Sequence, residues 1–165
     1  MEHIYSTLYS NKFLRGKIYM AKTMAEYHLG MKDYNGDPVY LHAFRMASAL
    51  DIREYDEDYI IAAILHDILE DGSSKKIPLE LEISFGEKVF EAIKIVTKSE
   101  SDTYFEYIQK VIDSKNQIAI RVKQIDIYDH LYHTESLPDS LKERYLKAAD
   151  MLGLKEKFYE TDKEK

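Results

Sequence analysis

Cysteine is absent from the 165 residues, and there are only three prolines and six glycines. Without thiols the chain can form neither disulfides nor cysteine-ligated zinc sites, and a reducing cytoplasm is the expected compartment. The scarcity of glycine and proline favours long helices over a turn-rich β-architecture.

Basic runs and long apolar stretches are also missing. The formal net charge is −7, which argues against binding to nucleic acid or to anionic membranes but leaves room for a local basic pocket. No apolar stretch approaches membrane-spanning length, and the N-terminus lacks the pattern of a signal peptide. Hydrophobic residues make up 45% and charged residues 32%, a balance typical of a globular domain that can bury a core.

Apolar residues recur with a helical period along nearly the whole chain. This pattern predicts an all-α single domain of seven to nine helices over residues 1–155, followed by a polar tail, 156–165, that frays. Asp37 and Asp56 are expected to cap helices, and Gly72 to end one. The expected helices cover residues 4–29 (one or two), 38–50, 56–72, a short one from 78, 86–97, 101–113, 116–133 and 138–153.

The segment ILHDILEDG, residues 64–72, ends an apolar run with one imidazole and three carboxylates. Positions i and i+4 share a face of a helix, so His66 would lie beside Glu70, and Asp67 beside Asp71. Because an uncompensated buried charge is costly, these carboxylates need a partner. A divalent metal would serve, and the lack of thiolates favours the harder ions. Acids that are simply solvated at a helix end are the alternative.

Two further residues sit in apolar surroundings. His42 lies on an apolar face with Val39, where a satisfied core histidine is the more common case, and Asp126 lies in the apolar stretch 118–128, where an unpaired acid would be costly. With His66 and Asp67 they form a His…His-Asp…Asp set drawn from three expected helices.

This series resembles the signature of the HD-domain metal-dependent phosphohydrolases. Over roughly residues 20–155 the surrounding segments are similar to the hydrolase domain of RelA/SpoT homologues. The resemblance implies an HD-domain helical bundle that removes the 3′-pyrophosphate from guanosine tetra- and pentaphosphate, the alarmones of the stringent response. The similar segments are KDYNGDPVYLH (32–42), LHDILED (65–71), FGEKVFEAIKIVTK (85–98) and RYLKAADMLG (144–153).

The same resemblance implies roles for individual residues. Its metal ligands are His42, His66, Asp67 and Asp126. The expected ion is Mn²⁺, with Fe²⁺, Mg²⁺ and Zn²⁺ as alternatives. Glu70 and Asp71 match the catalytic acid pair, which would orient or deprotonate the attacking water and help to protonate the departing ribose oxygen.

The expected partner is an anionic nucleotide substrate, and the sequence leaves the oligomeric state open. The candidate substrate contacts are three lysines, a histidine and a tyrosine, each with an ordinary surface or packing role as its alternative. They are Lys32, Lys98, Lys123, His130 and Tyr145.

The chain departs from the family pattern at positions that bear on the substrate. Met31 stands in a loop that usually holds a basic pair, His130 replaces an asparagine, and Asp129 adds a negative charge near a site meant for a polyanion. His130 could contact sugar or phosphate, or become a further metal ligand. Three hypotheses therefore stay open: an alarmone hydrolase, an HD-type hydrolase of another nucleotide such as a nucleoside monophosphate, and a non-catalytic nucleotide sensor.

Overall fold

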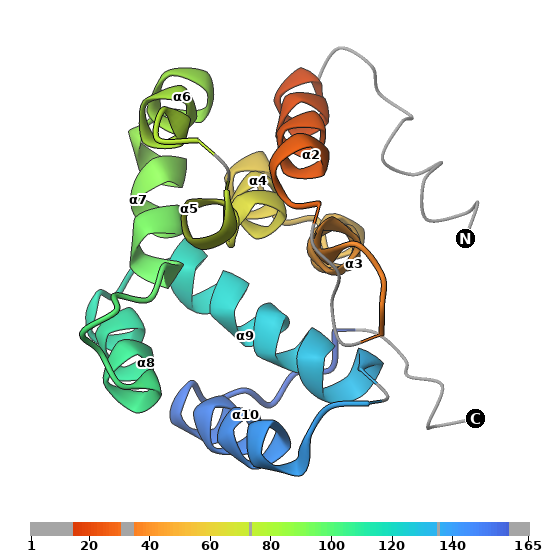
Figure 1. Cartoon of the computed structure of the whole chain (residues 1–165), viewed down its shortest axis with the longest axis vertical. Coiled ribbons are helices and arrows are strands. Elements are labelled where there is room, and N and C mark those ends of the chain that lie inside the picture. Colours follow the sequence, from red (N-terminus) through yellow and green to blue (C-terminus); the bar gives the residue numbers. More distant parts are fainter. Residues whose placement is uncertain (1–14, 31–34, 73, 135, 159–165) are drawn as a thin grey trace.

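The computed structural model describes residues 15–30, 35–72, 74–134 and 136–158, and within these it contains nine helices and no β-strand (Figure 1). The predicted all-α class is confirmed. The helices are α2 (Gly16–His28), α3 (Val39–Ile52), α4 (Glu57–Leu65), α5 (Ile68–Asp71), α6 (Ile77–Phe85), α7 (Glu87–Val96), α8 (Tyr104–Asp113), α9 (Gln117–His133) and α10 (Asp139–Met151). In this part of the chain no helix is long and apolar enough to cross a membrane.

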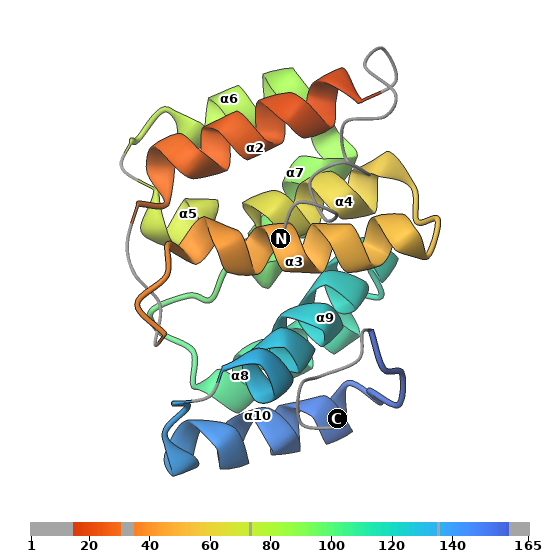
Figure 2. The same ribbon diagram turned by 90° about the vertical axis from the view of Figure 1, so that its right-hand side faces the viewer.

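Helix α4 lies at the centre of the bundle, with α2, α3, α7 and α9 packed around it. Figure 2 shows the stacking order, in which α2 and α6 lie at one end, α3 and α4 in the middle, and α9 with α10 at the other end. Six consecutive residues of α4, from Ile60 to Leu65, are all buried. An apolar run without a polar stripe requires neighbours on every side, which is why this helix is central.

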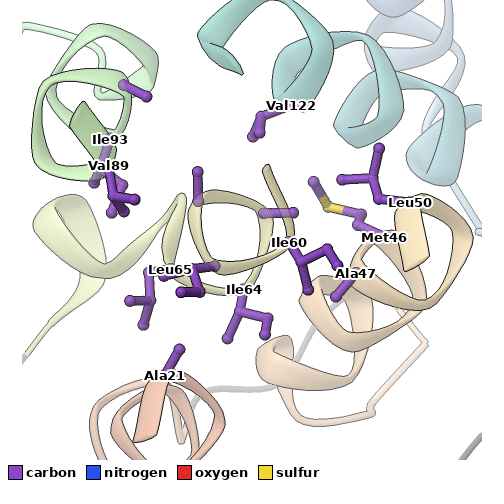
Figure 3. Packing of buried hydrophobic residues seen from close by; sticks show 14 of the residues in the cluster. Ala21, Met46, Ala47, Leu50, Ile60, Ile64, Leu65, Val89, Ile93 and Val122 are labelled. Atoms are coloured by element: carbon purple, nitrogen blue, oxygen red, sulfur yellow. The ribbon is translucent and has the colours of Figure 1, made fainter. Parts of the chain in front are cut away.

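The main core forms where the neighbouring helices close on α4 (Figure 3). Ile64 and Leu65 have no exposed surface, and burial of each stabilises the fold by about 1.5–3 kcal/mol. The side chains that surround them include Ala21, Met46, Leu50, Val89, Ile93 and Val122.

Helix α9 is buried on two sides, and this places its polar residues inside the molecule. Ile125 belongs to the main core, whereas Ile127 and Leu131 belong to a second cluster that α9 forms with α8 and α10. Asp126 and Asp129 lie between these apolar contacts and are 3% and 0% exposed.

The prediction of one continuous helix over residues 56–72 was wrong, because the structure has two helices there. Helix α4 ends at Leu65 and α5 begins at Ile68, with His66 and Asp67 in the turn between them. Asp67 has ψ −2°, and its carbonyl oxygen accepts from the N–H groups of both residues 70 and 71 as α5 begins. His66 Nδ1 contacts the Ala63 carbonyl oxygen at 2.8 Å, and such local side-chain bonds compete with helix continuation.

The starts of two helices differ from expectation in smaller ways. Pro38 occupies the N-cap position of α3 that was expected for Asp37, while Asp56 precedes α4 without a side-chain cap bond. Of the tail expected to fray, residues 159–165 lie outside the described residues, and Phe158 is 1% exposed and lies edge-on to Tyr128.

Candidate metal centre

Helices α3 and α9 face each other with matched polar residues. His42 and Arg45 are three residues apart on α3, and Asp126 and Asp129 are three apart on α9, so each pair shares one face of its helix. His42 Nδ1 lies 2.6 Å from Asp129 Oδ2, and Nε2 lies 3.1 Å from Asp126 Oδ1. Arg45 donates two hydrogen bonds to Asp129, at 3.0 and 2.8 Å. The interface thus holds a chain of contacts from Arg45 through Asp129 and His42 to Asp126.

The turn between α4 and α5 brings a second histidine to the same place. His66 is 4% exposed, and its Nε2 lies 3.1 Å from Asp67 Oδ2 and 3.7 Å from Asp126 Oδ1. Neither contact is a hydrogen bond, and this buried nitrogen has no hydrogen-bond partner among the described residues. The four predicted metal ligands are therefore linked in a chain of contacts, from His42 to Asp126, from Asp126 to His66, and from His66 to Asp67.

Asp126 is the centre of this cluster. Three imidazole nitrogens, from His42, His66 and His130, lie 3.1, 3.7 and 3.2 Å from its Oδ1 atom. Lys123 donates to the other oxygen, Oδ2, at 2.6 Å. One carboxylate oxygen thus faces three imidazoles while the other is neutralised by an ammonium group.

The charges of the cluster are strongly coupled. Burial alone lowers the pKa of His42, but the carboxylates of Asp129 and Asp126 outweigh it and raise this pKa to about 10. Burial opposes the charged form of Asp126 as well, yet Lys123 and the neighbouring imidazoles hold its pKa well below the usual range. Asp129 stays ionised in the same way, because His42 and Arg45 overcome the cost of burial and lower its pKa.

The predicted acid pair lies beside this cluster on α5. Although Glu70 and Asp71 both reach solvent, the surrounding protein removes enough water to raise the pKa of each, and the Asp67 carboxylate raises both further. Glu70 Oε1 accepts the backbone N–H of Lys98 at 2.6 Å. A carboxyl group with a raised pKa takes up a proton more readily than a free one, which suits it to general acid–base chemistry.

The predicted substrate contacts are placed unevenly. Lys123 lies at the cluster itself, and the Tyr145 ring stacks on His130 with the centroids 5.1 Å apart. The Lys98 ammonium group donates instead to the Ser99 and Asp102 carbonyl oxygens, at 3.0 and 2.9 Å, so it is engaged within its own loop. Met31 and Lys32 lie outside the described residues.

The sequence did not identify two residues, Asp129 and Arg45, as part of the cluster. Asp129 was expected to repel a polyanion, but its charge is matched by His42 and Arg45 in the interior. Arg45 was not singled out at all. The signal was available in the spacing, because Arg45 follows His42 by three residues and Asp129 follows Asp126 by three, which puts each on the face of its helix that carries a predicted ligand.

The donor set suits a divalent cation. The orphaned Nε2 of His66 is a buried polar atom that a metal ion would satisfy. In addition, one donor atom each from His42, Asp126 and His130 lies within 4.8 Å of the others, close enough to share an ion. Imidazole and carboxylate donors without thiolates are the ligands that Mn²⁺, Fe²⁺ and Zn²⁺ accept in proteins.

Comparison with known proteins agrees with this geometry. The chain belongs to the HD domain family, whose sequence profile matches residues 19–144 and so spans every proposed metal ligand. HD domains bind divalent metals, and the possible metal site in this structure lies within the matched region.

The relatives point to nucleotide metabolism. A probable guanosine-3′,5′-bis(diphosphate) 3′-pyrophosphohydrolase of Mycoplasma genitalium is 27% identical over 82% of this chain and 21% of its own length. The GTP pyrophosphokinase rsh of Brucella melitensis is 25% identical over 74% of this chain and 17% of its own length. The chain therefore spans about a fifth of the length of these curated relatives.

A solved structure shares the fold. It is described as a metazoan ortholog of SpoT that hydrolyzes ppGpp and plays a role in starvation responses. It superimposes with a TM-score of 0.66 over 83% of both chains, at 21% sequence identity. The predicted HD-type helical bundle is confirmed by the family match together with this likeness.

Proposed function

We propose that this chain is a metal-dependent phosphohydrolase that removes the 3′-pyrophosphate from guanosine tetra- or pentaphosphate. The observation that carries the proposal is the run of close contacts that joins His42, Asp126, His66 and Asp67, next to two carboxyl groups with raised pKa values. The relatives of known name supply the substrate class, because two of them are described as acting on, or hydrolysing, ppGpp.

The proposed ligands are His42, His66, Asp67 and Asp126. A divalent ion bound there, with Mn²⁺ as the first choice, would polarise the phosphoryl group and lower the pKa of a water molecule. Asp129 and Arg45 would keep His42 in place, and Lys123 would offset part of the negative charge of Asp126. The interior charge of Asp129 is matched, which removes one objection to a polyanionic substrate.

The acid pair would handle the protons. The oxygen of water forms a bond to the phosphorus next to the ribose, and the bond from this phosphorus to the 3′-oxygen breaks. Glu70 or Asp71 would accept the proton that water loses, and the leaving 3′-oxygen would take one up. The raised pKa values suit both carboxyl groups to this exchange. The products would be pyrophosphate and a guanosine 5′-di- or triphosphate.

A second substrate class deserves testing because His130, which replaces the family asparagine, contacts Asp126 directly. The experiment is a nucleotide panel, with guanosine tetraphosphate and nucleoside monophosphates incubated with the Mn²⁺-loaded chain and the products separated by chromatography. Pyrophosphate from the tetraphosphate supports the proposal, and orthophosphate from monophosphates supports the second class.

Matched variants show whether the cluster performs the reaction. His66→Ala should abolish turnover and metal retention, whereas His133→Ala, which changes an exposed histidine at the end of α9, should leave both intact. If no nucleotide is hydrolysed but one raises the melting temperature, the sensor hypothesis is favoured over an enzyme.

A further inference from the structure

His130 is placed among the donor atoms of the cluster. It follows Asp126 by one helical turn on α9, and its Nε2 lies 3.2 Å from Asp126 Oδ1. His42 Nε2 approaches the same oxygen at 3.1 Å from the facing helix. Within the described ranges, one donor atom each from His42, Asp126 and His130 lies close enough to the other two for the three to hold one ion.

The His130 ring is also held in a fixed orientation. It stacks on His42 on one side, with the centroids 4.4 Å apart and the planes at 28°, and on Tyr145 on the other, at 5.1 Å and 14°. Two flat neighbours restrict the rotation of the ring, and the one-turn spacing on α9 places Nε2 next to Asp126. The side chain is 23% exposed, so it borders both the buried cluster and solvent.

We propose that His130 is a further imidazole ligand of the divalent ion, in addition to His42, His66, Asp67 and Asp126. This inference rests on the proposed metal site and extends it. The donor set becomes three imidazoles and two carboxylates. His130 then belongs to the metal site, and Tyr145 acts as a positioning residue that holds its ring.

An added imidazole changes which ions the site prefers. Nitrogen donors favour the later first-row ions, whereas carboxylates favour Mn²⁺ and Mg²⁺. A site with His130 should therefore gain more affinity for Co²⁺ and Zn²⁺ than for Mn²⁺, relative to the same site without it. A histidine that only contacts sugar or phosphate would leave all three affinities unchanged.

The test uses the full chain, freed of metal and titrated with Co²⁺, Zn²⁺ or Mn²⁺ alone. His130→Phe keeps a flat ring between His42 and Tyr145 but removes the donor nitrogen, and His133→Ala is the matched control. Loss of an outer partner of a metal ligand typically costs ~10–100-fold in affinity, so loss of a ligand should cost at least as much for Co²⁺ and Zn²⁺. The decrease for Mn²⁺ should be smaller, and the visible absorption bands of bound Co²⁺ should shift.

The outcomes separate the two proposals. If the wild-type chain retains no divalent ion, the proposed metal site itself fails. If the wild type binds Co²⁺, His66→Ala does not, and His130→Phe binds it with unchanged affinity and spectrum, only the role of His130 is overturned. Circular dichroism checks that the variant folds, and His130→Gln is judged by the same criteria if the phenylalanine variant does not fold.

Discussion

Replacing Asp129 by asparagine should destabilise the metal-free chain more than the same change at Asp51, another aspartate that is paired with an arginine. Asp129 has no exposed surface, and its carboxylate contacts His42 at 2.6 Å and takes two hydrogen bonds from Arg45. Asp129→Asn preserves the shape of the side chain and removes its charge. Arg45 and His42 then lose the carboxylate that they share, while His42 keeps its contact with Asp126.

The size of the effect follows from burial. Removing one partner of a buried ion pair typically costs ~3–5 kcal/mol, and Arg45 is 20% exposed, so water can recover part of the loss. We therefore expect about 3 kcal/mol in the free energy of unfolding. Asp51→Asn is the matched control, because Asp51 also takes two hydrogen bonds from an arginine, Arg15, at a site closer to solvent. Its loss should cost about 1 kcal/mol.

The assay is urea unfolding of both variants in the presence of a chelator, followed by circular dichroism. A second measurement is metal affinity, which should fall ~10–100-fold in Asp129→Asn, as expected when the partner of a ligating histidine is lost. An Asp129→Asn variant that is no less stable than Asp51→Asn, or that binds metal as tightly as the wild type, would show that Asp129 does not have this role.

Three further predictions concern stability. Gly72→Ala should be strongly destabilising while Gly16→Ala is tolerated, because a Cβ at Gly72 would lie 2.2 Å from the Ile68 carbonyl oxygen and one at Gly16 meets nothing within 4 Å; thermal unfolding compares them. Thr103→Ala should lower the free energy of unfolding, measured in urea, by about 0.5–2 kcal/mol, since Thr103 and Glu106 form a capping box at the start of α8. The pKa of His42 is raised from 6.5 to about 10 in the folded chain. Its contribution to stability should therefore be complete below pH 6.5 and be lost as the pH rises towards about 10. Unfolding of the metal-free chain across this range should show the decline, and the decline should be smaller in Asp129→Asn.

Much of the fold could be predicted because its determinants are local. The apolar run from Ile60 to Leu65 has no polar stripe, so its central position follows from the sequence alone. Gly72 ends its helix as expected, and Asn116 caps α9 through a bond to the Ala119 N–H. The break at His66 was missed, because an uninterrupted helical pattern does not reveal that a side chain will compete for a backbone carbonyl.

The site was predictable in its ligand types but not in its connections. His42, His66 and Asp126 stood out as polar residues in apolar segments, and they do converge. The pairing of Asp129 with Arg45 depends on how α3 and α9 face each other, which no single segment encodes. The same holds for Lys98, whose ammonium group is bound within its own loop rather than at the cluster.

The proposed hydrolysis itself is tested most directly by following one turnover in water enriched in a heavy oxygen isotope. The Mn²⁺-loaded chain and guanosine tetraphosphate are mixed, and the products are analysed by mass spectrometry. We expect the label to appear in pyrophosphate and the guanosine diphosphate to carry none, because water attacks phosphorus and the ribose 3′-oxygen leaves. Label in the nucleotide or release of orthophosphate would contradict the proposed hydrolysis. An absence of turnover in both the wild type and His66→Ala would contradict it as well.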